Sequence, residues 1–239
     1  MKLLFVGDTH RNAYEAQRIN ALALYEKPDL IIQVGDFAYD YDNRDPKFLE
    51  TCAAGDVPWW FIRGNHDSTD WLRTQTGLDT TVAAPDQEPI DIWDNVWWLP
   101  DGTRAELDGV KFLFVGGAYS IDRWCRTEGV SYWVDELTPD PDLLPNLSLP
   151  TDVLVSHDVP AGLGSDFEKG LAEGRYKEDA ESQANRDRMR VIYDRCQPKV
   201  VIHGHYHTDY REGCLIGLSC DNMLGNTFSM DTTKLEFTE

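Results

Sequence analysis

The chain has 239 residues, 41% of them hydrophobic, which is enough for one large core, so we expect a single domain over residues 1–239. A formal net charge of -20 argues against non-specific binding of nucleic acid, where clustered Lys and Arg supply most of the affinity. Without a secretion signal, a CxxC pair or an uncharged apolar run near the roughly 18 residues of a membrane span, the sequence predicts a cytoplasmic protein that does not bind membranes.

Short apolar runs typical of buried strands recur along the chain, and each ends at a cluster of Gly, Asp, Asn or His. These runs are residues 3–6, 30–34, 59–62, 112–115, 153–155 and 200–202. Helical patterns lie between several of them, over residues 12–25, from a cap at Asp45 with Pro46 in the first helical position to a stop at Gly55, and over residues 178–196. The alternation predicts an α/β protein with parallel strands at its centre.

The middle of the chain has a different pattern. Residues 96–99, 104–107 and 110–115 are separated by turns at Pro100-Asp101-Gly102 and Asp108-Gly109, which predicts an antiparallel meander. A chain that combines βα units with such a meander can form two mixed sheets packed face to face with helices outside. We therefore expect a four-layer αββα sandwich. Residues 138–150 carry four prolines and are expected to form a connector.

Every histidine follows one of the apolar runs or lies in the adjoining polar turn. The six are His10, His66, His157, His203, His205 and His207. A single His or Asp in such a place is more often a surface residue, a helix cap or a satisfied core residue. However, the ends of parallel strands converge on one edge of a sheet, so residues far apart in sequence can meet in one crevice there. The joint placement therefore predicts a shared polar pocket.

Five polar clusters carry the chemistry. In chain order they are Gly7-Asp8-Thr9-His10, Gly35-Asp36, Gly64-Asn65-His66-Asp67, Ser156-His157 and Gly204-His205-Tyr206-His207. In this order and at these spacings they resemble the DxH, GD, GNHD, single His and GHxH signature of the calcineurin-like metallophosphoesterases. A lone GD carries no information. The ordered set of five is specific, because only His203 falls outside it.

The resemblance implies a phosphoesterase with two divalent metal ions and assigns their ligands. The first ion would be held by Asp8, His10, Asp36 and His207. The second would be held by Asp36, Asn65, His157 and His205, so that Asp36 bridges the pair. Carboxylate, imidazole and amide ligands suit Mn, which we expect, and also Fe, Zn, Co or Ni, whereas Mg prefers oxygen ligands alone. Two ions about 3.5 to 4 Å apart can clamp a phosphoryl group for in-line attack.

The resemblance also implies that His66 is not a ligand and donates a proton to the leaving oxygen. Asp67 and Asp158 are expected to orient the imidazoles of the ligands. Four arginines near the motif loops are candidates to bind phosphate oxygens, with surface ion pairing as the alternative for each. These are Arg11, Arg63, Arg123 and Arg126.

Two further residues fit the signature poorly. His203 fills no position in it, so we expect a structural hydrogen bond there. Tyr39 completes a GDxxY string that resembles the iron-tyrosinate motif of purple acid phosphatases. Those enzymes usually lack the histidine that His10 provides here, so packing or a substrate contact is expected for Tyr39.

The leading hypothesis is hydrolysis of a small phosphorylated substrate, namely a phosphodiester such as a cyclic nucleotide. A phosphomonoesterase or a Ser/Thr protein phosphatase is the alternative, although the GDxVDRG string of the latter is absent here. A different class is a non-catalytic scaffold with the same fold. Such relatives typically lose ligands or the catalytic His, and this sequence retains every position, which favours an enzyme. The oligomeric state stays open.

Overall fold

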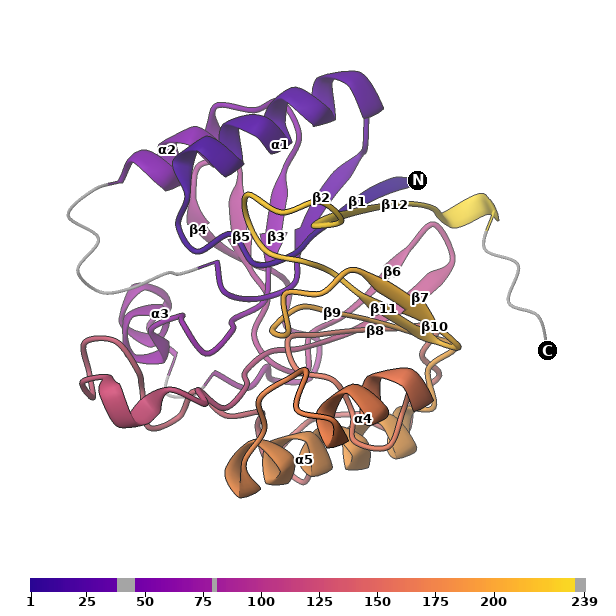
Figure 1. Ribbon diagram of the computed structural model, residues 1–239. Helices are drawn as coiled ribbons and strands as arrows, with labels where there is room; N and C mark the ends of the chain where they lie inside the picture. The colour runs from indigo at the N-terminus through magenta and orange to yellow at the C-terminus, as the bar shows by residue number, and fades with distance from the viewer. Residues whose placement is uncertain (38–45, 79–80, 235–239) are drawn as a thin grey trace.

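The computed structural model describes residues 1–37, 46–78 and 81–234, which contain two six-stranded mixed sheets (Figure 1). The first sheet has the order β12-β1-β2-β3-β5-β4, with parallel pairing from β1 through β5 and antiparallel strands at both edges. Its strands are β1 (Lys2–Val6), β2 (Leu30–Gln33), β3 (Trp59–Phe61), β4 (Ile90–Trp93), β5 (Val96–Trp98) and β12 (Thr227–Asp231). The predicted strands at residues 3–6, 30–34 and 59–62 are confirmed.

The second sheet has the order β10-β11-β9-β8-β7-β6 and the same design of parallel centre and antiparallel edges. Its strands are β6 (Arg104–Leu107), β7 (Val110–Val115), β8 (Val153–Ser156), β9 (Val200–His203), β10 (Tyr210–Glu212) and β11 (Leu215–Gly217). The strand predictions at residues 112–115, 153–155 and 200–202 are confirmed as well.

Helices cover the outer face of each sheet. In Figure 1, α1 (Ala13–Glu26) and α2 (Lys47–Ala53) lie over the first sheet, while α4 (Ser165–Ala172) and α5 (Ala180–Cys196) lie over the second. The short α3 (Thr69–Thr76) follows β3. None of the helices in the described parts of the chain has the length and apolar composition needed to cross a membrane.

Local sequence explains where the helices begin and end. The side chain of Asn12 caps α1 by accepting from the N–H groups of Tyr14 and Glu15, and Asp179 forms a capping box with Ser182 at the start of α5. The predicted helices at residues 12–25 and 178–196 are thereby confirmed. For α2, Asp45 lies outside the described residues, and Pro46 is the N-cap residue instead of the first helical one.

The alternation of side chains along each strand builds the layers. Leu4 and Val6 of β1 face α1, whereas Leu3 and Phe5 face the second sheet. Three clusters of buried hydrophobic residues result, one under α1 and α2, one between the sheets and one under α4 and α5. This is the expected αββα sandwich, in which β12 returns to pair with β1.

The expected meander is wrong in one respect. β6 and β7 form an antiparallel hairpin, but β5 pairs in parallel with β3 in the other sheet. The chain crosses between the sheets at the Pro100-Asp101-Gly102 turn: before it, Leu99 N–H donates to Phe61 O of β3, and within it, Gly102 N–H donates to Phe114 O of β7. The turn residues indicated a change of direction correctly, but they do not determine which strands pair.

Candidate metal centre

The predicted ligands lie beyond the carboxyl ends of central strands, as expected for an α/β crevice. Asp8, Asp36 and Asn65 follow β1, β2 and β3, while His157 and His205 follow β8 and β9. The site therefore lies where the ends of two sheets adjoin, and not at the edge of one sheet as the sequence suggested. The His157 ring joins the two sheets directly, because its Nδ1 lies 3.0 Å from Val34 O.

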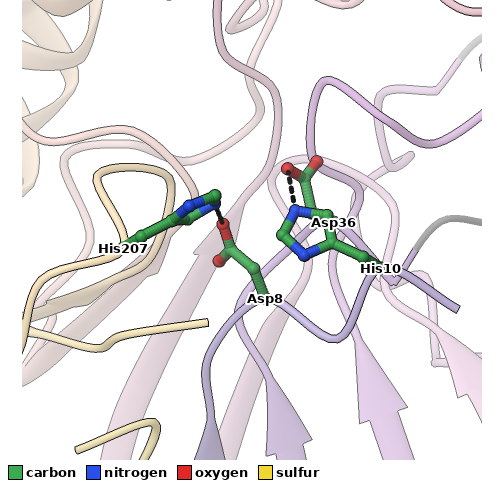
Figure 2. A group of neighbouring side chains, drawn as sticks. All are labelled: Asp8, His10, Asp36 and His207. Carbon is green, nitrogen blue, oxygen red and sulfur yellow. Dashed lines mark ion pairs between the residues drawn. The ribbon is translucent and has the colours of Figure 1, made fainter. Parts of the chain in front are cut away.

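The first group of side chains brings four donor atoms within 4.8 Å of one another: Asp8, His10, Asp36 and His207. Figure 2 shows them converging, with His207 paired to Asp8 and His10 paired to Asp36. His207 Nε2 lies 3.0 Å from Asp8 Oδ2, and His10 Nε2 lies 3.6 Å from Asp36 Oδ2. Both carboxylates are buried, and buried charges require a partner of opposite charge.

The second group meets the other oxygen of Asp36. His157 Nε2 lies 3.3 Å from Asp36 Oδ1 and 3.0 Å from Asn65 Oδ1, and the ring of His205 is centred 5.1 Å from that of His157. Asn65 Nδ2 donates to Ser120 Oγ, which in turn donates to the buried Glu136, so the amide oxygen of Asn65 is left facing His157. Asp36 thus presents one oxygen to each group, the disposition that a bridging ligand requires.

The backbone is also unusual at this site. Four of the predicted ligands adopt left-handed conformations, namely His10, Asp36, His205 and His207, with φ of 45°, 53°, 67° and 52°. Such conformations are costly for residues other than Gly and cluster at functional sites. Gly35 is required for close approach, because a Cβ there would lie 2.2 Å from His157 Nδ1. The geometry favours ligand placement at the expense of local backbone energy.

Hydrogen bonds fix which ring nitrogen faces the centre. His157 Nδ1 is held by Val34 O, and His10 Nδ1 lies 3.0 Å from Asp221 Oδ1, so both rings direct Nε2 toward Asp36. The sequence did not reveal Asp221. Its other oxygen accepts from Asn12 Nδ2 at 2.7 Å, and its N–H donates to Asp8 O, so it supports both Asp8 and His10.

Asp67 and Asp158 were expected to orient the imidazoles of the ligands, but their hydrogen bonds in the structure go to other groups. Asp67 Oδ2 accepts from Gly64 N–H at 2.6 Å and so holds the turn that carries Asn65. The role of Asp158 is corrected: its oxygens accept from Val159 N–H and from Asn185 Nδ2, which ties the strand end to α5. The carbonyl of Val34, and not the carboxylate of Asp158, therefore orients the ring of His157.

Replacing Asp221 by Asn should weaken divalent metal binding by about 10- to 100-fold, the usual effect of losing a carboxylate behind a ligating imidazole. The fold should be retained, because Asn keeps the shape of the side chain. Calorimetric titration with Mn²⁺ measures the change. Asp209→Asn is the matched control, since Asp209 is exposed in the same C-terminal region and pairs with Arg211. Equal affinities for Asp221→Asn and the control would show that Asp221 does not support the centre.

The buried carboxylates of the site favour positive charge beside them. Burial lowers the pKa of His10, but the hydrogen bond and charge of Asp36 outweigh burial and raise that pKa to about 9. Burial likewise opposes protonation of His157, yet Asp36 raises the pKa of this ring to about 10. Burial lowers the pKa of His205 well below its usual range, and the neighbouring His157 adds to this effect. The nitrogen and oxygen donors and these buried carboxylates fit a pair of borderline divalent ions.

Metal binding should release protons at pH 7. With pKa values of about 9 and 10, His10 and His157 are protonated in the metal-free protein at this pH, whereas a ligating imidazole must be neutral. Binding should therefore release up to about two protons, and the metal affinity should fall as the pH is lowered. Calorimetry in buffers of different ionisation enthalpy counts these protons. A heat of binding that does not depend on the buffer would contradict the expectation.

Comparison with known families agrees with this geometry. A sequence profile of the calcineurin-like phosphoesterases matches residues 1–209. The chain belongs to this family. It is therefore a metal-dependent phosphoric ester hydrolase, and the family's use of two divalent ions accords with the two groups of donors that share Asp36.

Solved structures resemble this phosphoesterase over nearly its whole length. The match to one crystal structure covers 98% of this chain and 96% of the other chain, with a TM-score of 0.57 and 14% sequence identity. The match to the protein TT1561 of Thermus thermophilus covers 92% of this chain and 89% of TT1561, with a TM-score of 0.54 and 13% sequence identity. The match to a structure described as a novel archaeal phosphodiesterase covers 99% of this chain and 96% of the other chain, with a TM-score of 0.45 and 15% sequence identity. The first two likenesses show the fold alone. None of the curated proteins compared with the chain matches it in sequence.

His66 lies beside the metal centre of the phosphoesterase without joining either group of donors. Its Nε2 is 3.9 Å from Asp36 Oδ2, and its ring is centred 5.5 Å from that of His10. Two guanidinium nitrogens of Arg126 each lie 2.9 Å from a ring nitrogen of His66. Burial lowers the pKa of His66, and Arg126 contributes to the shift. The side chain of His66 is 29% exposed, so a substrate can reach it.

The four candidate arginines differ in their surroundings. The prediction that Arg63 contacts the substrate is wrong. Its side chain is only 1% exposed and pairs with Asp101, and its Nη atoms donate to the carbonyls of residues 135–137. Arg123 pairs with buried Glu136 and lies over the rings of Tyr119 and Tyr132. Arg126 reaches the site directly through His66. Arg11 is half-buried next to His10, in a left-handed conformation.

His203 and Tyr39 were the two residues that fitted the signature poorly, and the structure describes only the first of them. His203 is buried and its Nε2 lies 2.6 Å from Tyr210 Oη, so the expected structural role is confirmed. Burial lowers the pKa of His203 to about 4, and the ring is therefore neutral at pH 7. Tyr39 lies outside the described residues, so its predicted role stays a prediction.

Proposed function

We propose that the chain hydrolyses small phosphodiesters, cyclic nucleotides among them, at a binuclear centre that holds manganese. The observation that carries the proposal is the position of Asp36, with Oδ2 facing His10 and Oδ1 facing His157. A carboxylate shared between two sets of donors can hold two ions close enough together to act on one phosphate. We assign the first ion to Asp8, His10, Asp36 and His207, and the second to Asp36, Asn65, His157 and His205.

The two ions, when bound, would lower the pKa of a water molecule and neutralise charge that develops on the phosphate. The remaining work belongs to side chains of the chain itself. Asp221 and Val34 O hold the imidazoles of His10 and His157 with Nε2 toward the centre. Ser120 fixes the amide of Asn65. These contacts preorganise the donors, so little rearrangement is needed when a phosphate arrives.

His66 is the proposed proton donor to the leaving oxygen. Its lowered pKa makes its imidazolium a stronger acid, and the negative charge of an incoming phosphate would favour the protonated ring. Arg126, held beside His66 by Asp122 and by Ser131 O, is the proposed contact to a non-bridging phosphate oxygen. Arg11 and Arg123 are proposed as further contacts on the same side.

The charge of the centre explains how so acidic a chain could attract a phosphate. Two divalent ions against the carboxylates of Asp8 and Asp36 leave a local charge of about +2. The chain as a whole carries -20. Because a bound ion is the largest local charge at a site, the centre can bind an anion that the surrounding surface repels.

A hydrolysis screen of the Mn²⁺-loaded protein tests the proposal. It compares cyclic nucleotides and aryl phosphodiesters with nucleotide monoesters, phosphopeptides and single-stranded oligonucleotides. We expect the highest kcat/KM on small diesters, loss of turnover after exhaustive chelation, and recovery on addition of Mn²⁺. A preference for monoesters or phosphopeptides would replace the proposed substrate class. Undiminished turnover after chelation would exclude the metal centre, and no turnover with both ions bound would favour a scaffold.

A further inference from the structure

A cavity of about 500 Å³ lies between the turn at residues 121–124 and the segment that joins α4 to α5. The first wall includes Asp122 and Trp124, and the second includes Tyr176, Lys177 and Glu178. The volume falls within the range of about 300 to 1,000 Å³ that is typical of small-molecule sites. None of the eight proposed ligands and catalytic residues lines this cavity. It is therefore distinct from the metal centre.

Both walls nevertheless lead directly to the centre. On the first wall, Asp122 Oδ1 accepts from Arg126 Nε at 2.6 Å, and Arg126 contacts His66. On the second wall, the ring of Tyr176 is centred 5.9 Å from that of Tyr206, whose ring lies 5.1 Å from that of His205. One side chain on each wall, Arg126 or Tyr206, thus separates the cavity from His66 and His205, a separation that the sugar of a nucleotide can span.

The side chains of the cavity suit a planar group that carries hydrogen-bond acceptors. The indole of Trp124 is 87% exposed, which is unusual for the side chain that buries most apolar surface, and Tyr176 supplies a second ring. The two carboxylates already have cationic partners, Asp122 in Arg126 and Glu178 in Arg186. They therefore do not require a cation from the ligand. The ammonium group of Lys177 is exposed and can donate to a carbonyl or ring-nitrogen acceptor.

The second wall is held rigidly enough to act as a platform. Arg186 is fully buried, pairs with Glu178 and Glu168, and lies 5.3 Å from the ring centre of Phe167. Phe167 in turn stacks on Tyr176 at 5.0 Å. These contacts anchor the segment between α4 and α5 to the two helices that flank it. A preorganised wall of this kind loses little entropy on binding.

We propose that this cavity is an aromatic subsite that binds the nucleobase of a nucleotide ester whose phosphate lies at the metal centre. Trp124 stacks on the base, Tyr176 contacts its other side or edge, and Lys177 donates to a base carbonyl. The inference rests on the proposed function and narrows it, because it assigns the substituent on one side of the phosphodiester. Trp124 and Lys177 are thereby specificity-determining residues.

Two substrates with the same leaving group test the subsite. The p-nitrophenyl ester of thymidine 5′-monophosphate carries a base, whereas methyl p-nitrophenyl phosphate does not. Trp124→Ala should raise KM for the nucleotide ester by about 5- to 150-fold, the range found when a base-stacking aromatic is removed. The kinetics of the methyl ester should not change, and Trp124→Phe should restore most of the loss. Trp93→Ala, at a partly exposed Trp on β4, is the matched control.

Binding measurements separate this inference from the proposed function. Calorimetric titration of the Mn²⁺-loaded protein with thymidine 5′-monophosphate should show weaker binding in Trp124→Ala and also in Lys177→Ala, with inorganic phosphate bound as before. If neither ester is hydrolysed but this difference in binding is found, the proposed function fails and the subsite stands. If Trp124→Ala affects both esters equally or neither, and leaves nucleotide binding unchanged, the subsite is overturned and the proposed function stands.

Discussion

Replacing Asp36 by Asn should remove the binuclear centre and with it all turnover. Its carboxylate faces both groups of donors, at 3.6 Å from His10 Nε2 and 3.3 Å from His157 Nε2, so one substitution weakens both sites. Loss of a residue behind a ligand costs about 10- to 100-fold in metal affinity, and loss of the shared ligand should cost more than about 100-fold. Metal content after dialysis against dilute Mn²⁺, measured by mass spectrometry, checks this expectation.

A control variant is needed because Asp36 also contributes to local structure. Its Oδ1 accepts from His66 N–H, and its carbonyl accepts from Thr9 and His10. Asn keeps the backbone contacts, and circular dichroism should show an unchanged fold. Asp56→Asn, at an exposed aspartate outside the centre, should bind two ions as the wild type does. If Asp36→Asn retained two ions per chain, the bridging assignment would be wrong.

His66→Ala should slow the hydrolysis of esters with poor leaving groups by about 100- to 10,000-fold, the usual contribution of a general acid. A ribose alkoxide needs a proton as it departs, whereas p-nitrophenolate is stable without one. Aryl esters should therefore lose far less. His66 lies near Asp36 but outside both groups of donors, so the metal content should be unchanged. Equal losses on alkyl and aryl esters would remove the acid role from His66.

The convergence of the candidate ligands could be predicted because they follow strands of regular pattern. Asp8, Asp36 and Asn65 each come directly after an apolar run, and sheet geometry alone brings the ends of parallel strands together. The sandwich was also predictable, since alternating residues such as Leu3 and Leu4 face different layers. Both inferences rest on periodicity and order along the chain.

What the sequence could not reveal depends on contacts between distant residues. Asp221 is 211 residues from its partner His10 and lies in a loop without a recognisable motif. Arg63 resembled a phosphate contact because it stands next to Gly64-Asn65, yet its guanidinium is buried against Asp101. β5 was misassigned because a turn at residues 100–102 suits a hairpin as well as a crossing between sheets. In each case the deciding partner is set by tertiary structure.

The most direct test is the crystal structure of the Mn²⁺-loaded protein, with anomalous scattering used to locate the metal. We expect two peaks about 3.5 to 4 Å apart on either side of the Asp36 carboxylate. One peak should contact His10 and His207, and the other should contact Asn65, His157 and His205. A single ion, or two ions held without Asp36, would contradict the binuclear centre on which the proposed function depends.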